Sequence, residues 1–168
     1  MTPHLVLSLC TIFVAPPIPQ EKAPEVAAKP GDSVVKVIAS IRLPNPIRPW
    51  TQSKAVEVSG SGVVIAGNKI LTNAHVLEYA TEVYVQAGPG ADKVEAKVET
   101  VGPDVDLAVL TVSDKKFFEK HKPLARAKAV PSPRDGVEVY GFSVGGDEMS
   151  VTKGVVSRIG YAPGGTGM

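Results

Sequence analysis

Two residues of this sequence, His75 and Asp106, have the types and the spacing to do chemistry together. An imidazole can take a proton from a nucleophile near neutral pH. A carboxylate held against its other ring nitrogen fixes the tautomer and stabilises the cation. His75 ends the segment Leu71-Thr-Asn-Ala-His75, and Asp106 opens the apolar run Asp106-Leu-Ala-Val-Leu110. A lone histidine at a strand end is more often a packing residue than a base, so the rest of the chain must decide between these roles.

Other residues compete for these roles less well. Asp104 shares strand parity with Asp106, but only Asp106 directly precedes the apolar run, where we expect burial beside the imidazole. The remaining histidines, His4 and His121, lie in the leader and in a charged connection, and we interpret both as incidental. Three dispersed histidines and a single cysteine give no metal-ligand spacing, so we expect no metal and no cofactor.

The composition is that of an ordinary globular chain. Its 168 residues carry a net charge of +1, with 43% hydrophobic and 21% charged residues. Bulk charge therefore gives no electrostatic attraction to nucleic acid or anionic lipid, and we expect no nucleic-acid partner. Sixteen glycines, fifteen prolines and many valines favour a β-rich fold over a helical bundle. The lone Cys10 excludes an intrachain disulfide.

The first 32 residues are expected to lie outside the folded part. Residues 5–15 are almost continuously apolar, a length that suits a signal-peptide core rather than a bilayer-spanning helix. Residues 1–15 are therefore predicted to be a signal peptide or a short anchor, although no Lys or Arg precedes the apolar run. Export to the periplasm, the cell envelope or the exterior follows from this interpretation. Residues 16–32 are rich in Pro, Ala and charge without a period, which predicts an extended linker.

The elements that must position His75 and Asp106 are short β-branched segments separated by turns. Two of them flank the turn Ala66-Gly67-Asn68, whose Gly and Asn tolerate the positive φ of a tight hairpin. Six segments are expected to be strands: 33–42, 55–65 with a kink at 59–61, 69–72, 81–86, 93–101 and 106–112. This spacing is typical of a small antiparallel barrel, so we predict an all-β, six-stranded barrel within residues 33–120.

The segments around this barrel are less regular. The proline-rich residues 43–50 predict a loop, which Trp50 is expected to pack against the fold. Residues 113–121 predict a short helix capped by Ser113 or Asp114. Strands over 136–142 and 149–159 are too few to close a barrel. Residues 121–168 are therefore predicted to be a connection and an incomplete second barrel.

The order of motifs resembles that of the trypsin-like serine proteases of the HtrA/Deg group. Gly60-Ser-Gly62 leading to Leu71-Thr-Asn-Ala-His75 resembles the group's histidine motif, and Asp106-Leu-Ala-Val-Leu110 its aspartate motif. The segments Val139-Tyr-Gly-Phe-Ser-Val-Gly-Gly146 and Val151-Thr-Lys-Gly-Val-Val-Ser-Arg158 resemble the stretch before its nucleophile loop. The resemblance covers about residues 33–160.

This resemblance implies a chymotrypsin-like fold of two β-barrels and a serine endopeptidase without cofactor. His75 would be the general base, and Asp106 would orient it. The group cleaves unfolded or damaged proteins, and its full-length enzyme could form a homo-oligomer.

The nucleophile of the resembling family is missing from this sequence. The family's serine lies in a Gly-Asn-Ser-Gly-Gly loop, whose backbone N–H groups form the oxyanion hole. No such segment follows Asp106, and the glycine-rich stretch around Thr166 contains neither Ser nor Cys. Five serines follow Asp106, and none has flanking glycines: Ser113, Ser132, Ser143, Ser150 and Ser157. We therefore predict a portion of a protease that ends before its serine and is inactive on its own. A non-catalytic, protease-like module that binds extended peptides stays open as the alternative.

Overall fold

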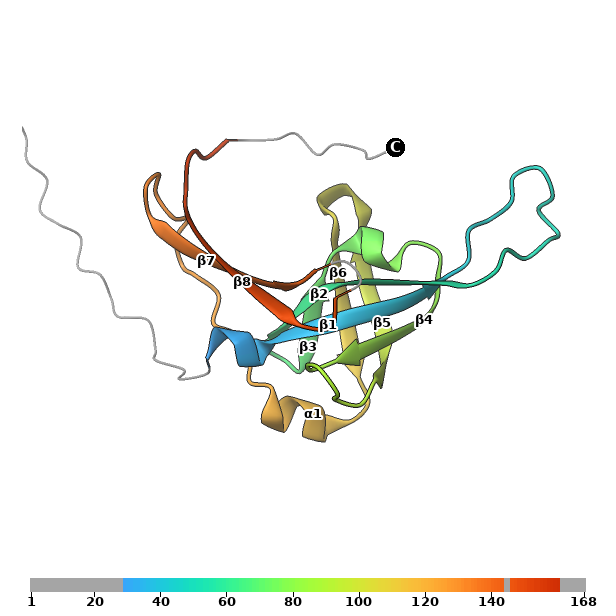
Figure 1. Ribbon diagram of the computed structural model, residues 1–168, viewed down its shortest axis with the longest axis horizontal. Coiled ribbons are helices and arrows are strands. Elements are labelled where there is room, and N and C mark those ends of the chain that lie inside the picture. The colour runs from blue at the N-terminus through green and yellow to red at the C-terminus, as the bar shows by residue number, and fades with distance from the viewer. Residues whose placement is uncertain (1–28, 144–145, 161–168) are drawn as a thin grey trace, which may run out of the picture.

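A computed structural model describes residues 29–143 and 146–160 of the chain. Their fold is all-β: six strands form a closed antiparallel barrel, and two more form a separate two-stranded sheet (Figure 1). This confirms the predicted fold class. The predicted signal peptide or anchor, most of the linker, His4 and Thr166 lie outside the described residues. Within the described part, no helix is long and apolar enough to span a bilayer.

The barrel closes in the strand order β1-β2-β3-β6-β5-β4, and each strand pairs with two neighbours. Its strands are β1 Val34–Ile41, β2 Val56–Ile65, β3 Lys69–Thr72, β4 Ala80–Gln86, β5 Val94–Gly102 and β6 Leu107–Val112. All lie within a residue or two of the expected segments, because strict alternation and β-branched residues mark strands whose one face is buried. Closure leaves no free strand edge in this unit.

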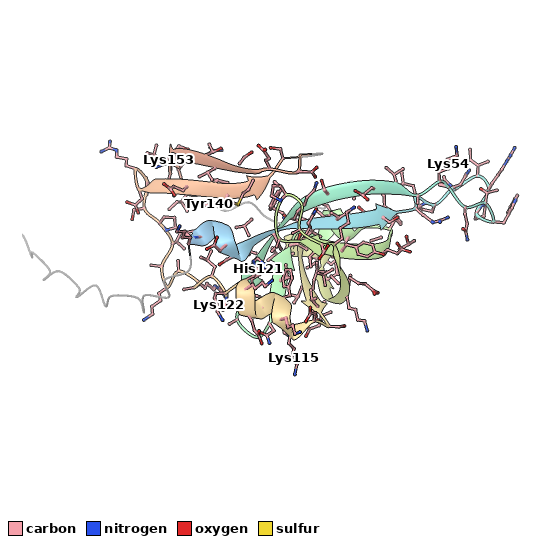
Figure 2. The ribbon with its side chains drawn as sticks, turned by 60° about the horizontal axis from the view of Figure 1, so that its bottom comes forward. Lys54, Lys115, His121, Lys122, Tyr140 and Lys153 are labelled. Carbon is pink, nitrogen blue, oxygen red and sulfur yellow. The ribbon has the colours of Figure 1, made fainter. Side chains whose placement is uncertain are left out.

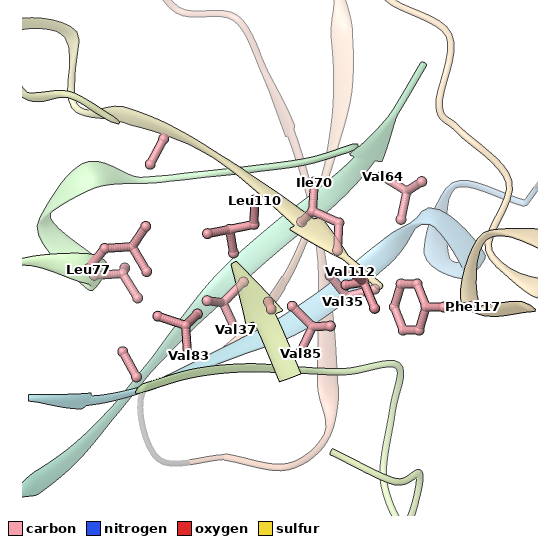
Figure 3. Packing of buried hydrophobic residues seen from close by; sticks show 14 of the residues in the cluster. Val35, Val37, Val64, Ile70, Leu77, Val83, Val85, Leu110, Val112 and Phe117 are labelled. Atoms are coloured by element: carbon pink, nitrogen blue, oxygen red, sulfur yellow. The ribbon is translucent and has the colours of Figure 1, made fainter. Parts of the chain in front are cut away.

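Aliphatic side chains fill the barrel interior (Figure 3). Val37, Ile70, Val85 and Leu110 come from four different strands and have no solvent-exposed surface. Burying one such side chain contributes about 1.5–3 kcal/mol relative to leaving it in water. The short helix α1 (Lys115–Lys120) closes one end with Phe117. The interior is therefore a dry hydrocarbon core.

Strand β2 runs without interruption, so the expected kink at residues 59–61 is wrong. All eight residues from Val56 to Val63 pair with β1 in one register. The glycines there are needed for close packing instead. A methyl group added at Gly60 would lie 2.7 Å from Cγ2 of Val76, and one at Gly62 would lie 2.9 Å from Cγ2 of Ile70. The strand thus accommodates its neighbours by lacking side chains at these positions.

The second sheet is a single antiparallel pair, β7 (Gly136–Phe142) and β8 (Met149–Val155). Strand β8 ends four residues before the expected position. Two hydrogen bonds tie the pair to the barrel. The hydroxyl oxygen of Ser61 accepts from the Phe142 N–H at 2.8 Å, and Lys36 Nζ lies 2.8 Å from Asp147 Oδ1. Phe142 is buried at this junction.

Two expectations about the connecting segments have different outcomes. Asp114 rather than Ser113 caps α1, because its side chain accepts a hydrogen bond from the Lys116 N–H at 2.9 Å. Trp50 does not pack the loop between β1 and β2 against the fold, since 79% of its surface is exposed. The loop is instead ordered by contacts among its own residues.

Candidate active site

His75 belongs to a one-turn 3₁₀ helix, η2 (Ala74–Leu77), that follows directly on β3. Val76 and Leu77 in this turn are buried, and Val76 packs onto Gly60 of β2. His75 points to the other side, and 67% of its side chain is exposed. The packing of its neighbours therefore fixes the backbone of His75 while leaving the ring accessible.

Asp106 ends the 3₁₀ turn η3 (Pro103–Val105) and stands immediately before β6. Its backbone has φ of 50°, the left-handed conformation that Asp tolerates better than most residues. Strands β3 and β6 are direct neighbours, with Thr72 opposite Ala108. The end of β3 and the start of β6 therefore meet at one edge of the barrel, which brings His75 and Asp106 together although 31 positions separate them.

The two side chains are in direct contact. His75 Nδ1 lies 2.8 Å from Oδ2 and 3.0 Å from Oδ1 of Asp106, and the His75 backbone N–H donates to Oδ1 at 2.9 Å. An ionised carboxylate can only accept, so the proton of the neutral ring is assigned to Nδ1. Nε2 then carries the lone pair and faces away from the carboxylate. This is the tautomer that a general base needs.

Asn73 also contacts this carboxylate, a contact that the sequence analysis does not predict. Its side-chain Nδ2 lies 3.1 Å from Oδ2 and 3.2 Å from the backbone oxygen of Asp106. Both acceptors belong to the residue with left-handed backbone, so Asn73 helps to hold that conformation. The only signal in the sequence is an amide side chain two positions before His75.

Hydrogen bonding lowers the pKa of Asp106 below its ordinary value. The backbone N–H of His75 is the largest cause, followed by the His75 side chain, while desolvation opposes the shift. The expected burial of Asp106 is wrong, since 47% of its side chain is exposed. Donors aimed at its oxygens keep this carboxylate ionised.

An open hollow of about 460 Å³ surrounds the pair. Its lining combines the polar groups of the pair with apolar surface from η2, β5 and η3: Ala74, His75, Leu77, Glu78, Val101, Pro103 and Asp106. A hollow that is open to solvent and lined in this way can receive an approaching nucleophile and an extended chain.

The other sequence candidates lie elsewhere. Asp104 is exposed within η3, and it is Asp106 whose carboxylate accepts the hydrogen bonds from His75. His121 follows α1, where its ring packs 4.8 Å from that of Phe117 and its Nδ1 lies 3.0 Å from the Asp32 carbonyl oxygen. It therefore joins the end of α1 to the turn η1 (Pro30–Ser33). Among the described residues there is no cluster of three or more potential metal ligands.

Comparison with known proteins agrees with this geometry. A family model described as a trypsin-like peptidase domain matches residues 60–167. Two Arabidopsis thaliana proteins described as mitochondrial Do-like proteases, Do-like 3 and Do-like 4, are 45% and 41% identical over 138 residues. Each alignment covers 80% of this chain, but only 24% and 26% of the relative. The chain thus spans about a quarter of the length of these relatives.

Solved structures give the same fold. The Rv3671c protease of M. tuberculosis in its active form superposes with a TM-score of 0.58 at 28% identity, covering 89% of this chain and 60% of its own. The HtrA-type protease AlgW, as an S227A variant with a tripeptide, gives a TM-score of 0.60 at 22% identity, covering 79% and 38%. The second likeness is one of fold alone.

The predicted export is wrong. Do-like 3 and Do-like 4 are named as mitochondrial and Do-like 2 of A. thaliana as chloroplastic, and none of these three is named as periplasmic or secreted. The prediction depended on the length and hydropathy of residues 5–15, and no basic residue precedes that run as a signal peptide requires. The family match, the Do-like relatives and the shared fold agree: this chain belongs to the trypsin-like peptidase family and is of the HtrA type.

Proposed function

We propose that this chain supplies the general base and the orienting carboxylate of an HtrA-type serine endopeptidase, with His75 as the base and Asp106 as the orienter. The observation that carries the proposal is the contact between His75 Nδ1 and Asp106 Oδ2 at 2.8 Å, with Nε2 directed away from the carboxylate. The pair does not serve the packing of the barrel core, since 67% of the His75 side chain and 47% of the Asp106 side chain are exposed.

In the proposed mechanism, Nε2 of His75 takes the proton of a serine hydroxyl as the oxygen attacks the scissile carbonyl carbon. Asp106 holds the ring in the Nδ1–H tautomer and stabilises the imidazolium that forms. The same Nε2–H then protonates the leaving amine. A water molecule next attacks the acyl-serine ester with Nε2 as its base, and the acyl group is released as the acid. The lowered pKa of Asp106 keeps the carboxylate ionised throughout.

The serine and the oxyanion hole would come from chain beyond residue 168. The sequence from Asp106 to Met168 contains no Gly-Asn-Ser-Gly-Gly segment, and the relatives are about four times as long as the aligned region. We propose that the 168-residue chain is inactive by itself. We also propose that the complete enzyme acts on unfolded or damaged proteins in a mitochondrion or chloroplast, because the names of its relatives give these organelles.

The test begins with the transcript downstream of the codon for Met168. We expect a frame, shifted or not, that encodes a Gly-Asn-Ser-Gly-Gly-like segment within a few tens of codons. The chain extended through that segment is then expected to hydrolyse casein. His75→Ala and Asp106→Asn should each lower the rate by about 10⁴-fold or more, since either change removes the base or its tautomer.

A matched pair of variants separates this role from a general need for the fold. Asp104→Asn alters a carboxylate in the same turn η3 that does not contact the ring, so it should leave the casein rate within about twofold. Unrelated sequence after a genuine stop codon, together with peptide binding that His75→Ala leaves unchanged, would refute the proposal. That outcome would establish a peptide-binding module instead.

A further inference from the structure

We propose that the loop between β1 and β2, residues 42–55, docks onto an anionic phospholipid surface. The loop projects from the barrel as its most extended feature (Figure 1). Its side chains make no part of the His75–Asp106 site, so this inference stands independently of the proposed protease activity.

The apolar side chains of this loop are unusually exposed. Ile47 is 83%, Trp50 79% and Leu43 54% exposed, and the first two are the most exposed large hydrophobic side chains of the described residues. A Trp ring combines an apolar body with one N–H donor and prefers the boundary between headgroups and hydrocarbon, while Ile favours the hydrocarbon itself. Such side chains at the tip of a projecting loop can enter a bilayer without any rearrangement of the barrel.

Hydrogen bonds among its own residues hold the loop in this shape. The Asn45 side-chain oxygen accepts hydrogen bonds from the N–H groups of Ile47 and Arg48, each at 3.0 Å. The Thr51 hydroxyl donates to the Arg48 carbonyl oxygen at 2.8 Å, and Pro44 forms an isolated bridge with Gln52. Three prolines, at positions 44, 46 and 49, restrict the backbone further. Docking would therefore cost little conformational entropy.

The positive charge of the loop favours anionic over neutral lipid. Residues 42–55 contain three cationic side chains, Arg42, Arg48 and Lys54, and no Asp or Glu. The net charge of the whole chain is only +1, whereas this segment alone carries three positive charges and no negative ones. Figure 2 shows Lys54 on the same projection. Cations near an anionic leaflet each strengthen binding severalfold, and this attraction falls with salt.

Other occupants fit these side chains less well. A second copy of the chain would bring an identical set of three cations against the first, and like charges at close range repel. A single-stranded nucleic acid could stack a base on Trp50, but Ile47, the most exposed large hydrophobic side chain of the described residues, offers no surface on which a base stacks. A bilayer accommodates the aliphatic, aromatic and cationic groups together.

The test uses the fluorescence of Trp50, which is the only tryptophan of the chain. The 168-residue protein is titrated with vesicles of phosphatidylcholine alone and of phosphatidylcholine with about one third phosphatidylglycerol. We expect a blue shift of the Trp50 emission, and quenching by brominated acyl chains, with the anionic vesicles. The affinity for them should exceed that for neutral vesicles by about tenfold or more and should fall at high salt.

Variants locate the binding to the loop. Ile47→Asp and Arg48→Glu are each expected to weaken sedimentation with anionic vesicles by about tenfold or more. Lys115→Glu makes the same charge change as Arg48→Glu at an exposed position on α1 and should change binding by less than about twofold. The apolar run 5–15 is intact in every variant, so differences among them report on the loop.

Several results would overturn the proposal. One is equal binding to neutral and anionic vesicles, and another is vesicle binding that Ile47→Asp and Arg48→Glu leave unchanged. A blue shift that follows protein concentration without vesicles would identify a second copy as the occupant. Quenching by single-stranded RNA without any response to vesicles would identify a nucleic acid.

Discussion

The barrel and the β7–β8 sheet have similar sequences but bury their side chains to very different extents. Both consist of antiparallel strands rich in valine with short turns between them. In the barrel every strand has two neighbours, and alternate side chains enter a closed core. Strand β8 is exposed along almost its whole length, including Val151 and Val155, and Val139 of β7 is exposed too. Alternation therefore gives burial only where the strands close on themselves or find a partner.

The closed barrel can therefore hold the two proposed catalytic residues in fixed positions. His75 and Asp106 both stand at the barrel edge where β3 and β6 meet. The β7–β8 sheet depends on the barrel instead, through Ser61, Lys36 and the buried Phe142. Four predictions test this contrast, from the largest expected effect to the smallest.

Truncating a core side chain should separate the two regions most clearly. Ile70→Ala is expected to lower the free energy of unfolding by about 2–5 kcal/mol, because it removes transfer energy and leaves a cavity in the closed barrel. Val139→Ala in β7 should cost less than about 0.5 kcal/mol, since Val139 is exposed. Urea denaturation measures both. Equal losses would show that the β7–β8 sheet contributes its own core.

Adding one methyl group to a glycine gives a matched comparison. Gly60→Ala should destabilise the fold by about 1–3 kcal/mol, because the new Cβ would lie 2.7 Å from Cγ2 of Val76. Gly154→Ala in β8 meets nothing within 4 Å and should be neutral or slightly stabilising. Thermal unfolding compares the two, and NMR shifts of the His75 ring should move only in Gly60→Ala. A destabilising Gly154→Ala would contradict the account.

Removing one hydroxyl should loosen the junction without harming the barrel. Ser61→Ala removes the oxygen that accepts from the Phe142 N–H, a hydrogen bond worth about 1 kcal/mol. Hydrogen exchange at Phe142 should accelerate about fivefold, while exchange at Val37 and Leu110 in the core stays unchanged. Acceleration throughout the chain would mean that the barrel and the β7–β8 sheet unfold as one unit.

Two carboxylates with lowered pKa values allow the smallest test. The backbone N–H of His75 is the largest cause for Asp106, whereas side-chain bonds from Tyr140 and Lys153 lower the pKa of Glu138 in β7. A lowered pKa means that the favourable contacts are complete above the ordinary pKa and are lost as the pH falls through the folded-state value.

Carboxyl NMR titrations at low and high salt measure the difference. Salt should move the pKa of Glu138 toward its ordinary value more than that of Asp106, because Glu138 depends in part on the exposed Lys153 charge. Asn73→Ala should raise the pKa of Asp106 slightly, because the Asn73 side-chain hydrogen bond is the smallest of the causes that lower it. An opposite order of salt sensitivity would contradict this explanation.

Much of the barrel could be predicted, because alternation and β-branching report directly on strands with one buried face. The pairing of His75 with Asp106 followed from motif order, since neighbouring strands bring their ends to one edge. The contact of Asn73 and the exposure of Asp106 could not be predicted. Both depend on how two 3₁₀ turns fold over the barrel edge, and short turns leave no periodic pattern.

Trp50 was misjudged for a different reason. Large aromatic side chains are usually buried, but this one lies in a loop whose prolines and Asn45 turn hold it away from the barrel. Trp50 does not reach the usual burial, because its loop is ordered by its own hydrogen bonds and not by packing on the barrel. The exposed Trp50 is one of the side chains through which we propose that the loop docks onto phospholipid.

The central claim is that His75 acts as a base for a serine that lies beyond residue 168. Labelling with a fluorophosphonate probe, which reacts with an activated serine, tests it most directly. We expect no labelling of the folded 168-residue chain. The chain extended through its serine loop should be labelled at that serine, and His75→Ala should abolish the labelling. Labelling of the 168-residue chain, or labelling of the extended chain that survives His75→Ala, would contradict the account.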